Sequence, residues 1–188
     1  MRVFAVMIAA STLLLAGEFP VGSHVSDIRV SSEGAPADIR PDAAKATAVV
    51  FVSVQCPVSN AYNERMAAIY KDYSGKGVQF AFVNANEQES QAAADEHAKQ
   101  HNLGFKVYKD VNNVLADQFD AQNTPEVFLF DHAGKLVYHG RIDDSREIAN
   151  VKSNDFRSAL DAVLAGQPVP VANTKQFGCT IKRVKKTS

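Results

Sequence analysis

Residues 51–59 read FVSVQCPVS, and they join an apolar segment to an amphipathic one. Residues 46–54 are almost wholly apolar and rich in β-branched side chains, a pattern that predicts a strand buried on both faces. After this stretch, aromatic and aliphatic residues recur at helical spacing as far as Tyr73, and two glycines then end the pattern. Cys56 therefore stands between a strand and a helix, and Pro57 suits the first helical turn.

The position of Cys56 gives its sulfur a particular environment. A thiol at the start of a helix lies close to unpaired backbone N–H groups and to the positive end of the helix dipole, which both stabilise a thiolate. The pKa of such a thiol falls to roughly 3.5–7.5, against about 8.5 for a free thiol. Cys56 is thus a candidate nucleophile. From its position alone, a small buried side chain that closes the strand is an equally good interpretation.

The rest of the chain alternates between strand and helix patterns. Strands are predicted at 78–83, 105–108, 127–130 and 136–140, and helices at 62–73, 87–102, 114–119 and 153–166, the last capped by Ser153. Alternating strands and helices favour parallel pairing, whereas a short loop containing Gly134 predicts a hairpin between the last two strands. The expected fold is α/β, with a central mixed β-sheet flanked by helices on both faces, over residues 46–167.

The N-terminus has the pattern of an export signal. Arg2 precedes a weakly polar run from 3 to 16, which is about as long as a signal core and short for a membrane-spanning helix. Residues 1–16 are predicted to be a signal peptide, with an uncleaved anchor as the alternative. Residues 17–45 have no clear period and are expected to form an extended entry segment with a short strand at 28–30. The domain is expected to be exported, periplasmic or secreted, where a disulfide persists.

Composition restricts the class of protein. The 188 residues are 46% hydrophobic and 22% charged, which excludes a disordered or low-complexity chain. With 20 basic and 21 acidic residues the net charge is -1, so the chain lacks the basic excess of a dedicated nucleic-acid binder. Residues 168–188 form a basic C-terminal tail without an acidic residue. No Walker or dinucleotide motif is present, and no bound cofactor is expected.

Several stretches resemble the thioredoxin-like superfamily. Residues 51–59 resemble its active-site segment, in which a second thiol or a serine follows the cysteine three residues later, and here that residue is Ser59. Residues 124–130, TPEVFLF, resemble its cis-proline loop and the strand that follows. Residues 138–144 (YHGRIDD) and 178–182 (GCTIK) are most similar to the alkyl hydroperoxide reductase and thiol-specific antioxidant (AhpC/TSA) group, a peroxiredoxin-like redoxin branch.

This resemblance implies roles for the residues of a site. Cys56 is then the attacking thiolate, and Ser59 donates a hydrogen bond toward it or caps the helix. A cis bond between Thr124 and Pro125 frees the Thr124 backbone to face a substrate. Thr124, Pro125 and Pro57 are therefore the expected substrate-binding residues.

Peroxide reduction needs more than a thiolate, because hydrogen-bond donors must polarise the leaving oxygen. Ser53 matches the hydroxyl of the peroxiredoxin pattern PxxxTxxC, and Arg141 is the candidate for its distant guanidinium. Val49 stands where the pattern has proline, and this departure weakens the peroxidase interpretation. An exposed arginine near Asp143 and Asp144 is also more often a simple surface ion pair.

Cys179 is the other cysteine, and without a CxxC pair the chain makes either one disulfide or two thiols. Because Ser59 cannot serve as a second thiol, Cys179 is expected to resolve oxidised Cys56, within the chain or across a homodimer. The 13 residues after Gly166 span at most roughly 43 Å, enough to return across a domain about 30 Å wide. A Cys179 packed alone at the far edge is the alternative.

The leading hypothesis is a thiol-dependent oxidoreductase with an antioxidant role. In it, Cys56 attacks a peroxide or a substrate disulfide, and an external thiol reductant restores the protein. The alternative is a non-catalytic binding or soft-metal-handling module, in which Cys56 and Cys179 are structural or hold an ion such as Cu(I). His97 and His101 have the spacing of a metal-binding pair but lack a third ligand, so a solvated helix face is favoured and no metal site is predicted.

Overall fold

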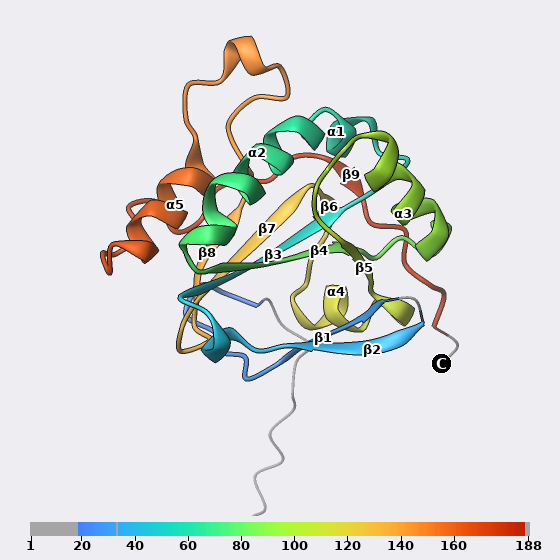
Figure 1. Ribbon diagram of the computed structural model, residues 1–188, viewed down its shortest axis with the longest axis horizontal. Coiled ribbons are helices and arrows are strands. Elements are labelled where there is room, and N and C mark those ends of the chain that lie inside the picture. The colour runs from blue at the N-terminus through green and yellow to red at the C-terminus, as the bar shows by residue number, and fades with distance from the viewer. Residues whose placement is uncertain (1–18, 33, 187–188) are drawn as a thin grey trace, which may run out of the picture.

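A computed structural model of the chain describes residues 19–32 and 34–186. Seven strands form one mixed sheet in the order β2-β1-β5-β4-β3-β7-β8, and two short strands, β6 and β9, form a separate pair (Figure 1). The predicted signal segment, residues 1–16, lies outside the described residues. Within the described part of the chain, no helix is long and apolar enough to cross a membrane.

From residue 46 onward the main strands and helices come in the predicted order. The strands are β1 (Ile28–Ser32), β2 (Ala35–Ile39), β3 (Ala46–Val52), β4 (Val78–Asn84), β5 (Val107–Lys109), β6 (Asn123–Thr124), β7 (Glu126–Asp131), β8 (Leu136–Gly140) and β9 (Cys179–Thr180). The α-helices are α1 (Pro57–Asn60), α2 (Asn63–Tyr73), α3 (Gln91–Gln100), α4 (Val114–Gln118) and α5 (Asp155–Leu164).

Strand β3 lies in the interior of the sheet, parallel to β4 and antiparallel to β7. All of its residues are buried, and from Ala48 to Val52 they alternate between two apolar clusters. Val50 packs on the face covered by α2, α3 and α5, whereas Val49 and Phe51 pack on the face covered by α4. Because both faces are covered, the strand is apolar apart from Thr47. The predicted mixed sheet with helices on both faces is confirmed.

The N-terminal segment is more ordered than its sequence predicts. Instead of one short strand within residues 17–45, β1 and β2 pair as an antiparallel hairpin, and β1 extends the sheet beside β5. The turn contains Gly34 in the left-handed region, with φ of +79°. Strand β2 is mostly exposed, so its sequence APADI lacks the apolar alternation by which a half-buried strand is recognised. The folded unit therefore begins before residue 46.

Three helix starts also differ from the prediction. The helix expected at 87–102 begins only at Gln91, with Ser90 as its N-cap. The helix expected to continue from Cys56 is split near Tyr62 into α1 and α2, where the buried Tyr62 hydroxyl is hydrogen-bonded to the loop after β8. The N-cap of α5 is Asn154 rather than Ser153. The Ser153 hydroxyl instead donates to the Asp155 carboxylate at 2.6 Å.

After α5 the chain returns across the molecule as the red segment in Figure 1. It first runs beside β8, where the His139 N–H donates to the Ala172 carbonyl and the Thr174 N–H donates to the His139 carbonyl. Strand β9 then pairs antiparallel with β6, immediately before β7. The predicted basic tail is thus packed on the domain, and it passes the end of the sheet at which β3 terminates.

Candidate active site

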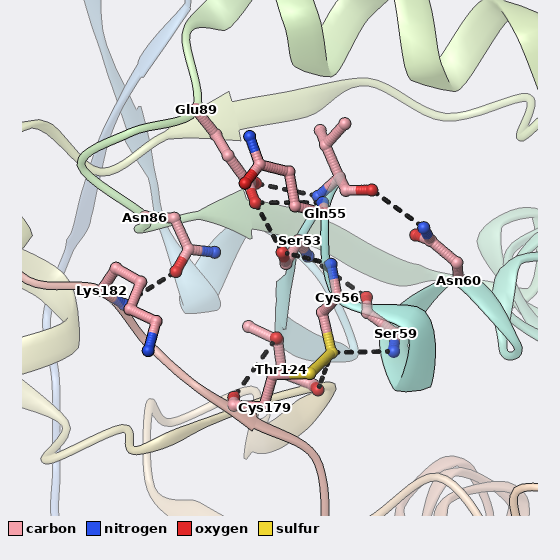
Figure 2. Close-up of a disulfide and its surroundings, with 11 residues drawn as sticks. Ser53, Gln55, Cys56, Ser59, Asn60, Asn86, Glu89, Thr124, Cys179 and Lys182 are labelled. Carbon is pink, nitrogen blue, oxygen red and sulfur yellow. Dashed lines mark hydrogen bonds between the residues drawn. A yellow bond between two sulfur atoms is a disulfide. The ribbon is translucent and has the colours of Figure 1, made fainter.

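Three segments meet at the end of the sheet where strands β3 and β4 terminate (Figure 2). Cys56 follows β3, Glu89 lies in the loop after β4, and the Thr124–Pro125 peptide, which is cis, precedes β7. Because β3 is parallel to β4 and antiparallel to β7, the ends of the first two strands and the start of the third lie together. The topology therefore brings together polar and reactive groups from parts of the chain that are far apart in sequence.

Cys56 is the N-cap residue of α1, and Pro57 occupies the first helical turn as predicted. The Ser59 N–H donates a hydrogen bond to Cys56 Sγ at 3.3 Å, so the sulfur itself caps the helix. The same sulfur lies 3.3 Å from the carbonyl oxygen of Thr124. Cys56 is only 3% exposed. A donor aimed at the sulfur stabilises its thiolate whenever the sulfur is reduced.

Cys56 forms a disulfide with Cys179, which lies 123 residues later, and their Cα atoms are 5.9 Å apart. The pairing of β6 with β9 sets Cys179 directly opposite Thr124. Of the arrangements considered from the sequence, the structure has the bridge within one chain. Cys179 is half-buried, so it is the more accessible of the two cysteines.

Gly178 allows the tail to approach the cis-proline loop this closely. A Cβ atom on this residue would lie 2.1 Å from the carbonyl oxygen of Thr124 and 2.7 Å from its carbonyl carbon, whereas ordinary contact begins at 3.4 Å. Any side chain here would push the tail away from the loop. Gly178 is therefore a condition for the position of Cys179, and only the folded contact reveals it.

A buried carboxylate organises the loop that carries Cys56. Glu89 is 3% exposed and accepts hydrogen bonds from the Ser53 hydroxyl at 2.7 Å, the Val54 and Gln55 N–H groups at 2.8 and 3.1 Å, and the Asn84 amide. Burial raises the pKa of Glu89, but these hydrogen bonds outweigh it and hold the pKa below its ordinary value. The carboxylate is therefore ionised at neutral pH.

The network extends beyond Glu89 in both directions. Ser53 Oγ accepts a hydrogen bond from the Cys56 N–H at 3.0 Å, so one hydroxyl links the carboxylate to the backbone of Cys56. On the other side, Asn84 Oδ1 accepts from the Lys109 ammonium at 2.9 Å. Burial lowers the pKa of Lys109, and the charge of Glu89 opposes that shift. The sequence does not single out Glu89, because a glutamate within the predicted polar helix at 87–102 resembles any solvated helix residue.

A second buried carboxylate organises the cis-proline loop on the other side of Cys56. Glu126 is fully buried directly after the cis bond, and it accepts from the Gln122 and Asn123 N–H groups at 2.7 Å each, from the His139 imidazole at 2.7 Å and from the Gln176 amide at 3.1 Å. It thus ties together the cis-proline loop, β8 and the returning tail. Glu126 lies within residues 124–130, the stretch that resembles a cis-proline loop, but the sequence does not indicate these partners.

The side chains of three residues predicted for the site are bonded to neighbouring protein groups. The Ser53 hydroxyl donates to the buried Glu89 carboxylate, and the Ser59 hydroxyl accepts from the Ser53 N–H at 3.2 Å. Ser59 therefore contacts Cys56 Sγ through its backbone N–H and not through its hydroxyl. The Arg141 guanidinium pairs with Asp155 at 2.7 Å. The donors expected to polarise a peroxide are thus engaged elsewhere.

The two histidines on α3 lie close together, with ring centroids 4.3 Å apart. His97 Nε2 is 3.1 Å from the Asn63 amide nitrogen. Among the residues described, no three His, Cys, Asp or Glu side chains are grouped to hold a metal ion. The two cysteines are bonded to each other, whereas a soft ion needs them as free thiolates.

Known proteins resemble this chain in sequence and in structure. The AhpC/TSA family model matches residues 21–139. The thiol-disulfide oxidoreductase ResA of Halalkalibacterium halodurans is 26% identical over 129 residues, covering 69% of this chain and 70% of that protein. An uncharacterized conserved protein from Geobacillus kaustophilus superposes with a TM-score of 0.81 at 29% identity, covering 90% of this chain and 95% of that chain.

A more distant structure bears on the fold alone. The thioredoxin domain of a thiol-disulfide oxidoreductase from Bacteroides vulgatus superposes with a TM-score of 0.56 at 15% identity, covering 65% of this chain and 89% of that chain. The predicted thioredoxin-like fold is confirmed.

Proposed function

The chain belongs to the AhpC/TSA family, and on that premise we propose that it is a thiol-disulfide oxidoreductase whose redox pair is Cys56 and Cys179. The observation that carries the proposal is the disulfide, which joins a cysteine at a helix start to one aligned by β9 over the cis-proline loop. The similarity to a protein named as a thiol-disulfide oxidoreductase supports the same chemistry.

The reaction has two exchange steps. In the reduced protein, the Cys56 thiolate attacks one sulfur of a substrate disulfide and bonds to it, while the other substrate sulfur leaves as a thiolate. The Cys179 thiolate then attacks Cys56 Sγ, closes the intramolecular disulfide and releases the second substrate thiolate. The substrate gains two electrons, and the protein dithiol loses them. An external thiol reductant returns the two electrons by the same kind of exchange.

The surrounding groups have supporting roles in this cycle. The Ser59 N–H stabilises the Cys56 thiolate, both as the attacking group and as the leaving group when the bridge is reduced. Glu89 fixes the loop that carries the nucleophile, acting through Ser53. Thr124 aligns Cys179 through the β6–β9 pair. These roles follow from contacts that are present with the bridge closed.

Disulfide exchange is favoured over peroxide reduction by the positions of the polar groups. Peroxide cleavage develops charge on an oxygen that needs donors near the attacking sulfur. The Ser53 hydroxyl is bonded to Glu89 and the Arg141 guanidinium to Asp155, whereas thiolate leaving groups do not depend on such donors. An antioxidant role by peroxide reduction remains a separate prediction.

The compartment and the partners belong to the same proposal. An exported location, periplasmic or secreted, suits a protein whose two cysteines form a disulfide, because an oxidising environment maintains such bonds. The partners are then a disulfide substrate and an external thiol reductant. The apolar run at residues 3–16 is the sequence feature that supports export. N-terminal sequencing of the protein from its host tests cleavage of this segment.

The decisive experiment compares two oxidants on the fully reduced protein. Oxidised glutathione and hydrogen peroxide are added separately, the reaction is quenched with acid, and the state of each cysteine is read by mass spectrometry. We expect oxidised glutathione to close the Cys56–Cys179 bridge, and Cys179→Ser to accumulate glutathione on Cys56. Reaction of Cys56 with oxidised glutathione no faster than that of free cysteine refutes the proposal. A peroxide rate far above that of free cysteine supports the peroxidase branch instead.

A further inference from the structure

On the basis of the proposed function, we infer that Cys56 takes low-molecular-weight disulfides and excludes disulfides within extended polypeptides. The reason lies in the tail. The chain's own residues occupy the groove beside the cis-proline loop, and contacts other than the disulfide hold them there.

The groove is occupied by β9. A polypeptide that docks along the cis-proline loop must pair with the backbone of β6, as extended peptides do when they add to a free strand edge. That edge already pairs with β9, and Thr124 is opposite Cys179. Gly178 is pressed against the Thr124 carbonyl with no room for even a Cβ atom. A second extended chain therefore fits only if β9 leaves.

The segment before β9 is fixed to the sheet. Thr174 Oγ1 accepts a hydrogen bond from the Arg141 N–H at 3.1 Å and lies 2.8 Å from the Tyr138 hydroxyl. A Cβ on Gly140 would lie 2.0 Å from the same Thr174 oxygen, which shows how closely the tail packs against the end of β8. Gln176 then donates to the buried Glu126 carboxylate at 3.1 Å.

The segment after β9 is fixed equally well. The Ile181 side chain is 3% exposed and belongs to the apolar cluster under α4, and its N–H donates to the Gln122 carbonyl at 2.9 Å. Lys182 exchanges backbone hydrogen bonds with the loop after β4, as donor to Asn86 Oδ1 and acceptor from the Glu87 N–H, each at 2.8 Å. Arg183 pairs with Asp117 at 2.8 Å.

None of these contacts requires the disulfide. Only residues 177–180 lie between Gln176 and Ile181, so reduction frees the Cys179 side chain without releasing the tail. Rotation of one cysteine side chain opens a path to Cys56 Sγ for a small disulfide, whereas a polypeptide must displace β9 from both anchors. A tethered segment has an effective concentration in the millimolar range, so it outcompetes a polypeptide at about 10 µM roughly 100-fold.

The experiment uses the full chain with Cys179→Ser, which keeps the tail and stops the reaction at a mixed disulfide on Cys56. Oxidised glutathione and insulin supply a small and a polypeptide disulfide, and the adduct on Cys56 is quantified by mass spectrometry. Each rate is divided by that of free cysteine with the same disulfide, which removes their intrinsic difference in reactivity. We expect the normalised rate to be about 100-fold higher for oxidised glutathione.

Two further substitutions in this background test the cause. Ile181→Ala removes most of a buried anchor and is expected to raise the insulin rate roughly tenfold, with the glutathione rate unchanged. Ile39→Ala is the matched control, because Ile39 is buried to the same degree in the same cluster but lies on β2. It is expected to change neither rate.

Three outcomes overturn the inference. Equal normalised rates for the two disulfides mean that the tail does not exclude polypeptides. An Ile181→Ala protein with an unchanged insulin rate means that the anchors are not the cause. If Cys56 reacts no faster than free cysteine with both disulfides, the proposed function is refuted and the inference fails with it. This result differs from the other two because the small disulfide is then also unreactive.

Discussion

Replacement of Gly178 by alanine tests whether the position of Cys179 depends on the close approach of the tail to Thr124. The new Cβ would lie 2.1 Å from the Thr124 carbonyl oxygen, more than an ångström inside ordinary contact. The obstacle is backbone of the cis-proline loop, so it cannot rotate away. Overpacking of this kind costs about 1–3 kcal/mol. The oxidised protein bears more of this cost, because the disulfide fixes Cys179 itself, whereas in the reduced protein residues 177–180 can shift within the limits set by the Gln176 and Ile181 anchors.

This cost appears in the equilibrium between disulfide and dithiol. At about 30 mV for each 1.4 kcal/mol, 1–3 kcal/mol raises the reduction potential by roughly 20–65 mV, so the variant's disulfide is easier to reduce. The potential is measured by equilibration in glutathione or dithiothreitol buffers, with the oxidised fraction read by alkylation and mass spectrometry. Gly75→Ala is the matched control, because nothing lies within 4 Å of a Cβ at that position. A Gly178→Ala protein with an unshifted potential would show that this reasoning is wrong.

Three further predictions concern the groups around the site. Glu89→Gln replaces one accepting carboxylate oxygen by an amide N–H₂ that faces hydrogen-bond donors. Because at least one donor then loses its acceptor, the substitution is expected to lower the free energy of unfolding by about 1–3 kcal/mol. Because the pKa of Glu89 is lowered on folding, its contribution is present above about pH 4.3 and is lost as the pH falls below it; urea unfolding at several pH values should show a weaker acid dependence for the variant. Arg141→Ala should destabilise the fold by about 1–3 kcal/mol, because it removes the ion-pair partner of Asp155, yet leave the exchange rate with oxidised glutathione unchanged. A slower exchange in a folded variant would assign Arg141 to the chemistry. Burial, assisted by the charge of His101, lowers the pKa of His97, so the unfolded chain binds the proton more tightly and stability should fall as the pH drops through about 6.5; His97→Gln should remove this slope, and an unchanged slope would contradict the assignment.

The order of strands and helices and the location of Cys56 are predictable from sequence because they depend on local patterns. The apolar run of β3, the helical stripe ending at Tyr73 and the proline after the cysteine each report on a few neighbouring residues. The β1–β2 hairpin escapes prediction because an exposed edge strand needs no apolar alternation. Local patterns thus identify the strand that precedes Cys56, but not the edge strands of the sheet.

The groups that complete the site escape prediction for a different reason. Glu89 and Glu126 act through hydrogen bonds to segments that the sheet brings together, and a glutamate in a sequence does not reveal such partners. Gly178 matters because of one contact with Thr124, made across 54 residues of sequence. The resemblance to a known superfamily located the cis-proline loop, whereas the path of the tail depends on anchors such as Ile181 that local patterns do not reveal.

The separation of the two cysteines changes what oxidation does to the fold. In the chain-entropy model, a bridge that closes a loop of 123 residues restricts the unfolded chain by roughly 5 kcal/mol, against roughly 2 kcal/mol for a CxxC pair. Opening the long bridge therefore costs folding stability that a CxxC protein does not lose. We expect the tail contacts to keep the reduced protein folded, because the buried Ile181 and the Gln176–Glu126 hydrogen bond involve neither cysteine. Under the proposed function the same anchors therefore serve two purposes: they keep Cys179 beside Cys56 for resolution, and they let the bridge open without releasing the tail.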